Sequence, residues 1–182
     1  MKVLILQGSP RANGNTAWMA EECRKAAEAA GHEVTLVDVA HKKIAGCMAC
    51  EYCHGKGNGT CVQKDDMQEL YPLLAEAEVL VLAAPIYYFT MSAQIQAPIQ
   101  RIYNMQKPPK VKKMAMLLSS YSPNVYDGAI GEYHGIQRYW ALRMPASSPR
   151  RSTSRKLTPP ATRFSSSSVS SDLSCHNQRK EL

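Results

Sequence analysis

Apolar and polar positions follow two different periods along the first part of the chain. Val3–Leu6 is a short apolar run, followed by a polar loop and then by residues 16–30, where small apolar residues recur at helical spacing. This change of period predicts a buried strand, a loop and an amphipathic helix. Asn15 is the expected N-cap of that helix, and Gly31 is its expected stop.

The same alternation of strand and helix patterns continues to Trp140. The further expected elements are strands at Val34–Val39, Val79–Ala84 and Lys112–Leu118, and helices at Asp66–Ala77, Ser92–Asn104 (interrupted or kinked at Pro98) and Gly128–Trp140. Strands that alternate with helices predict an α/β protein with a doubly wound parallel sheet. Ligands of such sheets bind at the carboxyl ends of the strands.

Length and hydropathy restrict the class of protein. The chain has 182 residues, of which 45% are hydrophobic, and this is enough for one core but short for two. No segment approaches the roughly 20 consecutive apolar residues that a membrane span needs, and the first apolar run is shorter than a signal-peptide core. We therefore expect a cytoplasmic protein without a membrane partner.

The positive charge is concentrated in the last 40 residues. Residues 143–182 carry eight Lys and Arg against two Asp and Glu, and residues 1–142 carry 14 against 13, so +6 of the net +7 lies in the tail. The tail also holds eleven Ser and four Pro and shows no helical or strand period, which predicts disorder and a domain boundary near residue 142. Because the charge belongs to this tail, we expect no nucleic-acid partner for the domain.

The loop after the first strand has the chemistry of a phosphate site. Residues 8–16 read Gly-Ser-Pro-Arg-Ala-Asn-Gly-Asn-Thr and offer backbone amides, hydroxyls and side-chain amides at the amino end of a helix. The loop lacks the patterns typical of nucleoside triphosphate and dinucleotide sites, so a phosphomonoester fits it better. The alternative is an ordinary polar loop followed by a capped helix.

A second loop joins the third expected strand to its helix and carries three adjacent aromatic residues, Tyr87-Tyr88-Phe89. Aromatic side chains in a solvent loop leave a large apolar area uncovered. A planar cofactor ring would cover it, and so would a neighbouring subunit. Ser119, directly after the fourth expected strand, falls where a third contact to the same ring would come.

Four cysteines follow the second expected strand within fifteen residues, spaced C-x2-C-x2-C-x7-C. The x2 spacing allows adjacent sulfurs to converge on one centre, and thiolates in such numbers select iron–sulfur clusters or zinc. Three cysteines in consecutive x2 steps favour a [4Fe–4S] cluster over zinc. Free or redox-active thiols are the other alternative. The expected ligands are Cys47, Cys50, Cys53 and Cys61.

These loops resemble those of the NADPH-dependent FMN reductase and iron–sulfur flavoprotein group within the flavodoxin-like superfamily. The phosphate loop carries that group's Gly-Ser-Pro-Arg-x-Asn-Gly-Asn-Thr pattern, and residues 84–92 resemble its Pro-x-Tyr loop. The resemblance implies phosphate contacts from Ser9, Arg11, Asn13, Asn15 and Thr16, and flavin-ring contacts from Pro85, Ile86, Tyr87 and Tyr88, with Ser119 as a weaker candidate. Residues 46–61 resemble the compact cysteine motif of the iron–sulfur members.

The resemblance implies a homodimeric or tetrameric FMN-dependent oxidoreductase that relays electrons between a [4Fe–4S] cluster and FMN, with a ferredoxin-type donor. An NAD(P)H-dependent FMN or quinone reductase without a cluster is the second interpretation. A non-catalytic flavin electron carrier or sensor is the third. The sequence indicates no single catalytic residue.

The resemblance also implies a flavodoxin-like sheet of order 2-1-3-4-5, whose fifth strand and closing helix should follow Trp140. Residues 143–182 contain four prolines, and they contain no run of three apolar residues. We therefore expect the C-terminal strand and helix to be missing, as after a frameshift, and apolar sheet surface to be exposed. The alternative is a tail that docks on a partner.

Overall fold

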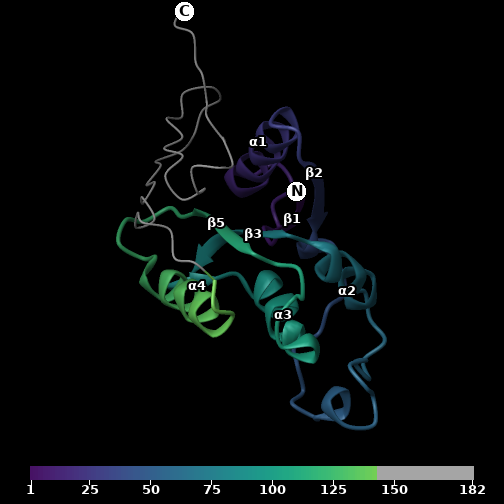
Figure 1. The fold of residues 1–182 in the computed structure, drawn as a ribbon. Helices are drawn as coiled ribbons and strands as arrows, with labels where there is room; N and C mark the ends of the chain where they lie inside the picture. The colour runs from purple at the N-terminus through teal and green to yellow at the C-terminus, as the bar shows by residue number, and fades with distance from the viewer. Residues whose placement is uncertain (143–182) are drawn as a thin grey trace, which may run out of the picture.

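A parallel sheet with helices on both faces forms the centre of the computed structural model, which describes residues 1–142 (Figure 1). Its parallel strands lie in the order β2-β1-β3-β5, which agrees with the expected order 2-1-3-4 for the first four. Their bounds are β1 Lys2–Gln7, β2 Glu33–Asp38, β3 Val79–Tyr87 and β5 Lys113–Ser119. Central strand β3 is buried from Val79 to Ile86, as its continuous apolar run predicts.

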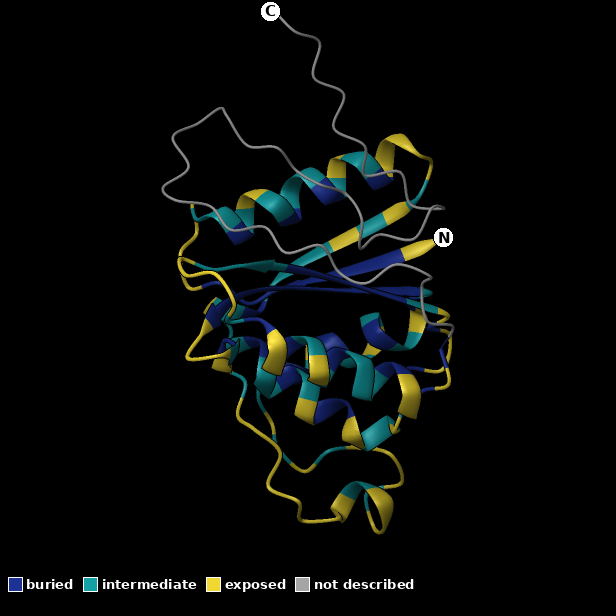
Figure 2. Ribbon diagram, turned by 90° about the vertical axis from the view of Figure 1, so that its left-hand side faces the viewer, coloured by how far each residue is buried: buried dark blue, intermediate teal, exposed yellow. Residues whose placement is uncertain are grey.

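The helices form two layers, which Figure 2 shows edge-on. Helix α1 covers one face of the sheet, and α2, α3 and α4 cover the other. Their bounds are α1 Asn15–Ala29, α2 Met67–Glu76, α3 Ala93–Arg101 and α4 Asp127–Tyr139. The described chain also has three short 3-10 turns: η1 Val39–His41, η2 Tyr52–His54 and η3 Ile102–Met105. The apolar side chains of the strands therefore pack into two hydrophobic cores, one on each face of the sheet.

Only the amino end of α1 differs from the prediction. Gly14, and not Asn15, is the N-cap, because Gly14 has extended backbone angles and Asn15 already begins the helix. At the other end Gly31 stops the helix as predicted, with φ +81°. Its N–H donates to Glu28 O and the following amide donates to Ala27 O, which is the hydrogen-bond pattern of a Schellman motif.

Two local features differ from the sequence pattern. Helix α3 continues past Pro98 and passes into η3 at Ile102, so the predicted interruption is wrong; the proline removes only one backbone hydrogen bond and is buried. Beyond β3 the chain forms a hairpin with the short antiparallel strand β4 (Thr90–Met91), which the sequence pattern did not indicate.

The face of the sheet under α1 is buried. Helix α1 packs against β1, β3 and β5, and Ala115 and Leu117 on β5 are buried beneath it. In the described strands β1, β3 and β5 the apolar side chains beneath α1 are therefore buried, and the wider expectation of uncovered sheet and helix surface stays a prediction. The predicted disordered tail, and the predicted lack of a last strand and helix after residue 142, lie outside the described residues and stay predictions.

Candidate functional site

The phosphate loop follows β1 directly and leads into the amino end of α1. Gly8 N–H donates to Ala83 O on β3 at 2.8 Å, and the Ser92 hydroxyl donates to Gly8 O at 2.7 Å. A Cβ on Gly8 would lie 2.6 Å from the Cβ of Ile95, so only glycine allows the loop to pass this close to α3. These contacts with β3 and α3 fix the conformation of the start of the loop.

Two hydroxyls of the loop are held inside the protein. Ser9 is 3% exposed and Thr16 is 2% exposed, although serine and threonine usually lie at the surface. Ser9 N–H donates to Gln7 Oε1 at 2.5 Å, and its Oγ accepts from Arg11 N–H at 3.2 Å. Sequence analysis did not single out Gln7, whose only signal is a polar residue that ends an apolar strand.

Three strand ends meet at this loop. The Thr16 Oγ1 and Ser119 Oγ atoms lie 2.7 Å apart, and Ser119 pairs in register with Pro85 on β3. The structure thus brings together predicted contact residues from the first loop, the aromatic loop and the end of β5. Arg11 and Asn13 are exposed at the surface of the same loop, and Asn15 is half-buried in the first turn of α1.

The amino end of α1 has the features of an anion site. No side chain caps this end, because its N-cap is Gly14. The first-turn amides of a helix lack partners within the helix, and the helix dipole places partial positive charge there. Uncapped amides beside the buried Ser9 and Thr16 hydroxyls fit a phosphate group.

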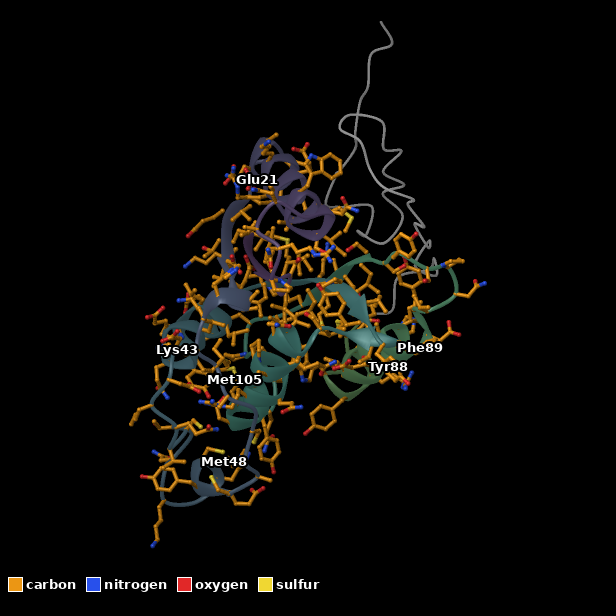
Figure 3. All side chains as sticks on the ribbon, turned by 180° about the vertical axis from the view of Figure 1, so that it is seen from behind. Glu21, Lys43, Met48, Tyr88, Phe89 and Met105 are labelled. Atoms are coloured by element: carbon orange, nitrogen blue, oxygen red, sulfur yellow. The ribbon has the colours of Figure 1, made fainter. Side chains whose placement is uncertain are left out.

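The aromatic loop is a tight hairpin with exposed rings. Tyr87, Tyr88 and Phe89 are 43%, 94% and 59% exposed, and the last two rings meet edge-on with centroids 5.7 Å apart. Figure 3 shows Tyr88 and Phe89 together at the margin of the molecule. Both residues have positive φ, 50° and 72°, which bulky side chains rarely adopt. Pro85 and Ile86 are buried beneath them in β3.

The cysteine loop, residues 46–61, projects from the layer of α2 and α3 (Figures 1 and 2). Its outer part rests on η3: Tyr103 Oη donates to Glu51 Oε1 at 2.8 Å, and Asn104 Nδ2 donates to Gly59 O at 2.9 Å. Cys47 and Cys50 are exposed, while Cys53 and Cys61 are half-buried. Met48, beside the first of these cysteines, lies far from the aromatic hairpin in Figure 3.

The four thiols do not form the expected single centre in this conformation. Within residues 1–142, no three His, Cys, Asp or Glu side chains come close enough to hold a metal ion. The reason is local: Ala49 and Glu51 have positive φ, so the residues between the cysteines do not form one helical turn. Burial raises the pKa of the Cys53 thiol, and the nearby Cys61 and Cys47 add to the effect.

The donor set nevertheless fits a thiolate-ligated group. The Ala49 N–H already points to Cys47 Sγ at 3.4 Å, and amide donors of this kind accompany ligating sulfurs. An amide donor of this kind is typical of the surroundings of a metal-bound thiolate.

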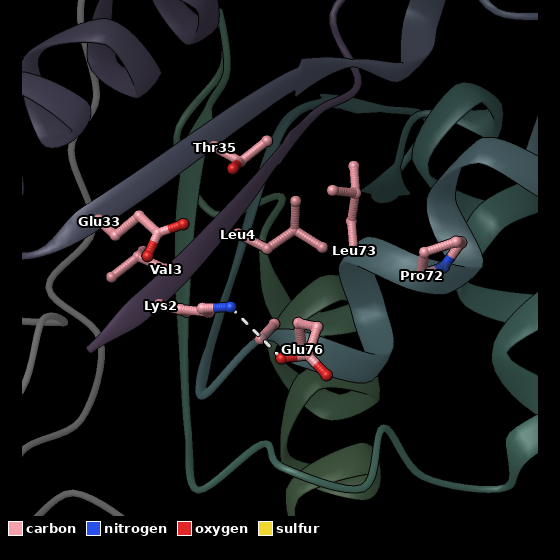
Figure 4. Close-up of a pocket in the computed structure, with 9 residues that line it drawn as sticks. Lys2, Val3, Leu4, Glu33, Thr35, Pro72, Leu73 and Glu76 are labelled. Carbon is pink, nitrogen blue, oxygen red and sulfur yellow. Dashed lines mark hydrogen bonds and ion pairs between the residues drawn. The ribbon is translucent and has the colours of Figure 1, made fainter.

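A separate hollow lies at the opposite edge of the sheet. It has a volume of about 230 Å³ and is lined by the first residues of β1 and β2 and the last turn of α2 (Figure 4). The Lys2 ammonium lies 3.3 Å from the Glu76 carboxylate across it. Because ligands of doubly wound sheets bind at the carboxyl ends of the strands, this hollow is not the candidate site.

Comparison with known proteins shows the family of the chain. The family described as NADPH-dependent FMN reductase matches residues 1–154. The chain belongs to the NADPH-dependent FMN reductase family. An iron–sulfur flavoprotein of Archaeoglobus fulgidus is 36% identical to it over 136 residues, which cover 75% of this chain and 56% of that protein. The chain spans about half the length of the curated relatives it matches.

Solved structures of flavodoxin-like reductases share the fold of this family member. An FMN-dependent NADH-azoreductase of Bacillus anthracis, solved in complex with FMN, superimposes with a TM-score of 0.58 at 11% identity, covering 78% of this chain and 83% of that one. An NAD(P)H:quinone oxidoreductase of Methanothermobacter marburgensis superimposes with a TM-score of 0.56 at 17% identity, covering 79% and 72%. None of the described helices is long and apolar enough to cross a membrane.

Proposed function

We propose that this chain is an FMN-dependent oxidoreductase that binds the flavin phosphate at the amino end of α1. The convergence of Ser9, Thr16 and Ser119 at the carboxyl edge of the sheet carries the proposal. Family membership supports it, because the family is described as FMN reductases. The same edge of the sheet is where ligands of this fold class bind.

The phosphate is held by groups that are already in place. The Ser9 and Thr16 hydroxyls donate to it, together with the first amides of α1, while the exposed Arg11 supplies charge. Asn13 and Asn15 add side-chain amide donors at the rim of the loop. Because these groups are fixed by the surrounding structure, little ordering accompanies binding.

The aromatic hairpin would hold the ring of the flavin. Pro85, Ile86 and Tyr87 would border the ring, and the exposed Tyr88 at the tip of the hairpin would contact it. The bound flavin would accept and release electrons, while these side chains orient its ring and exclude water from one face. Exposed apolar area at the hairpin is reduced by that contact.

The cysteine loop is the proposed iron–sulfur site. Cys47, Cys50, Cys53 and Cys61 supply the four thiolates that a [4Fe–4S] cluster needs. The iron–sulfur flavoproteins related to this chain support the assignment. These four thiolates would hold the cluster, which would supply one-electron transfer to the flavin, and a ferredoxin-type protein would be the electron donor.

The second candidate function is an NAD(P)H-dependent FMN or quinone reductase whose thiols carry no metal. The separation of the four thiols among the described residues favours it, as does the likeness of the fold to reductases that use NAD(P)H. A carrier or sensor without turnover differs from both, because it accepts electrons without passing them to a defined acceptor.

The exposed aromatic residues also support a homodimer or tetramer. Tyr88 and Phe89 project from the hairpin. Tyr121, which lies two residues after the end of β5, is 85% exposed. Large exposed aromatic side chains mark interaction sites. A second copy seated here would border the flavin ring that we place on the same hairpin.

Electron-donor assays distinguish these functions. The purified protein is loaded with FMN and mixed anaerobically with NADPH, NADH or a reduced ferredoxin, and the flavin absorbance is followed. Reduction by ferredoxin and not by NADPH supports the cluster-dependent oxidoreductase. Steady-state NADPH oxidation with a quinone supports the second candidate, and failure to bind FMN would contradict both.

A further inference from the structure

The segment around the cysteine loop is positively charged, whereas the rest of residues 1–142 is slightly negative. Residues 41–64 contain four Lys and one Glu, and the other positions of residues 1–142 contain ten Lys and Arg against twelve Asp and Glu. The segment projects from the layer of α2 and α3 (Figures 1 and 2). A partner that approaches the loop therefore meets a local excess of positive charge.

Three lysines of this segment have no acidic partner within residues 1–142. Lys42 forms an ion pair with Glu69, whereas the exposed ammonium groups of Lys43, Lys56 and Lys64 form none. The only carboxylate within the segment belongs to Glu51, and it is turned toward η3, where it accepts a hydrogen bond at 2.8 Å. The three lysines are therefore available to an acidic group from outside.

The acidic residues directly after the loop hold its two ends together. The Arg101 guanidinium donates to both carboxylate oxygens of Asp65, at 2.6 and 3.1 Å, and to Ala45 O at 3.0 Å. The Asp65 carboxylate also accepts from Ala45 N–H at 3.0 Å, and the Asp66 carboxylate accepts from Lys43 N–H at 2.7 Å. Because the Arg101 side chain is 1% exposed, Asp65 is neutralised by a buried cation and not by the exposed lysines.

Exposed apolar side chains occur in the same loop. Met48, Tyr52 and Val62 are 60%, 40% and 41% exposed, and Figure 3 shows Met48 in the outer part of the loop. Methionine and tyrosine are enriched at protein interfaces, where a polar rim surrounds an apolar centre. We call the exposed lysines and these apolar residues together the loop surface: Lys43, Met48, Tyr52, Lys56, Val62 and Lys64.

The loop surface is held in one conformation by its own turns and by η3. Gly57 N–H donates to Tyr52 O and Gly59 N–H donates to Cys53 O, both at 2.7 Å. A Cβ on Gly57 would lie 2.6 Å from the Tyr52 ring, so the chain folds back closely on this side chain. Asn104 Nδ2 donates to Gly59 O at 2.9 Å from η3. A surface that is already ordered loses little conformational entropy when a partner binds.

The chemistry of the loop surface favours an acidic protein over other polyanions. The phosphate backbone of a nucleic acid would contact the lysines and leave the apolar side chains uncovered. An anionic membrane is contacted best by an amphipathic helix, whereas this segment is a loop, whose backbone groups would lose water without gaining partners.

A second copy of this chain is a poor match for the loop surface. Several of its exposed carboxylates already pair with its own cations: Glu21 and Glu28 with Arg24, Glu76 with Lys2 and Lys110, and Glu78 with Lys112. A partner of a different kind, with unpaired carboxylates around an apolar patch, fits better.

We propose that the loop surface is the docking site for a small acidic protein, whose carboxylates meet the three lysines and whose apolar residues cover the three apolar side chains. The choice of an electron-transfer protein as this partner rests on the proposed function, whereas the docking surface itself needs no metal in the loop. The lysines steer the encounter, and the apolar contacts slow dissociation.

The test measures the association and dissociation rate constants of the FMN-loaded full chain with an oxidised, acidic ferredoxin at low and high salt. We expect binding that weakens as the salt concentration rises. Joint replacement of the three lysines, by Lys43→Gln, Lys56→Gln and Lys64→Gln, should lower the association rate constant by about tenfold at low salt and leave dissociation nearly unchanged. Met48→Ser should instead raise the dissociation rate constant.

An equal change of charge elsewhere is the matched control. Lys25→Gln, Lys110→Gln and Lys112→Gln together remove three positive charges from exposed ion pairs on other parts of the surface. Exposed pairs contribute little to stability, so this variant should fold and should bind the ferredoxin as the wild type does. Melting and FMN content are measured for every variant.

Each other outcome is decisive. Absence of ferredoxin binding, or equal loss in the two triple variants, overturns the inference. Binding of a DNA duplex or of phosphatidylglycerol vesicles that is as tight as ferredoxin binding, and is lost in the loop-surface variant, also overturns it. A protein that docks ferredoxin but binds no FMN, or whose flavin reduced ferredoxin does not reduce, contradicts the proposed function and leaves the docking surface in place.

Discussion

Ser9 and Thr16 show how single side chains define the candidate site. Hydroxyls at 3% and 2% exposure lose most of their contact with water, so they need partners inside the protein. Ser9 finds one in the Arg11 amide, and Thr16 finds one in Ser119. A phosphate at the amino end of α1 would add a charged acceptor within the same loop.

Thr16→Ala should weaken FMN binding by roughly 10- to 150-fold, because it removes about one charge-assisted hydrogen bond of 1.5–3 kcal/mol. Ser9→Ala should act in the same direction. The dissociation constant is measured by quenching of FMN fluorescence. Thr35→Ala, on β2 at the opposite edge of the sheet, is the control and should leave the affinity unchanged. Wild-type affinity in both loop variants contradicts the phosphate assignment.

Replacing any one of Cys47, Cys50, Cys53 or Cys61 by Ser should remove iron while FMN is retained, because the two proposed sites use different loops. Iron and flavin contents per chain are the measurements. Cys23→Ala is the control. Cys23 is a buried core residue of α1, so this variant should retain the iron content of the wild type. A full iron content in all four loop variants would falsify the cluster.

At the scale of elements, the approach of α4 to the aromatic hairpin depends on one glycine. A Cβ on Gly128 would lie 2.5 Å from the Phe89 carbonyl oxygen, whereas a Cβ on Gly131 in the same helix meets nothing within 4 Å. The first position is constrained by the backbone of the hairpin, which is hard to shift. The second is an ordinary helix interior.

Gly128→Ala should therefore destabilise the protein by about 1–3 kcal/mol through overpacking. Gly131→Ala should stabilise it by about 0.5–1 kcal/mol, because alanine is the better helix former. The free energy of unfolding in urea measures both. Equal effects of the two substitutions would show that α4 does not pack on the hairpin as described.

The Asp65–Arg101 pair links the cysteine loop to α3, and its contribution depends on pH. The folded-state pKa of Asp65 lies below its ordinary value of 3.8, so the stabilisation is fully present above that pH and is lost as the pH falls through the lower folded value. Asp65→Asn should cost about 3–5 kcal/mol at neutral pH, since it leaves the buried guanidinium unpaired. Unfolding measured against pH should show this difference shrinking below pH 3.8. A difference that is constant with pH contradicts the pair.

At the scale of the whole molecule, periodicity alone predicted each long helix and strand of residues 1–142. The strand and helix expected at residues 79–84 and 128–140 appear as Val79–Tyr87 and Asp127–Tyr139, because burial on a sheet or one helix face imposes its period directly on the sequence. The β3–β4 hairpin was missed because its turn is formed by Tyr88 and Phe89, whereas two-residue hairpin turns usually carry Asn or Gly.

The site was predictable only where its chemistry is local. The phosphate loop is contiguous in sequence, so its residues are recognised together. Arg101 contacts Ala45 and Asp65, which flank the cysteine loop, from a distant position, and an arginine within an amphipathic helix gives no sign of such a contact. The separation of the four thiols among the described residues was not predictable from their spacing, because positive φ at Ala49 and Glu51 redirects the chain.

The most direct test of this account is an anaerobic visible spectrum of the purified protein with flavin, iron and sulfide analysis on the same sample. The account predicts bound FMN at about one per chain, with about four iron and four sulfide that disappear when the loop cysteines are replaced. A protein that contains FMN but no iron or sulfide would contradict the cluster. A protein that neither contains FMN nor binds it when FMN is added would contradict the flavin site at the carboxyl edge of the sheet.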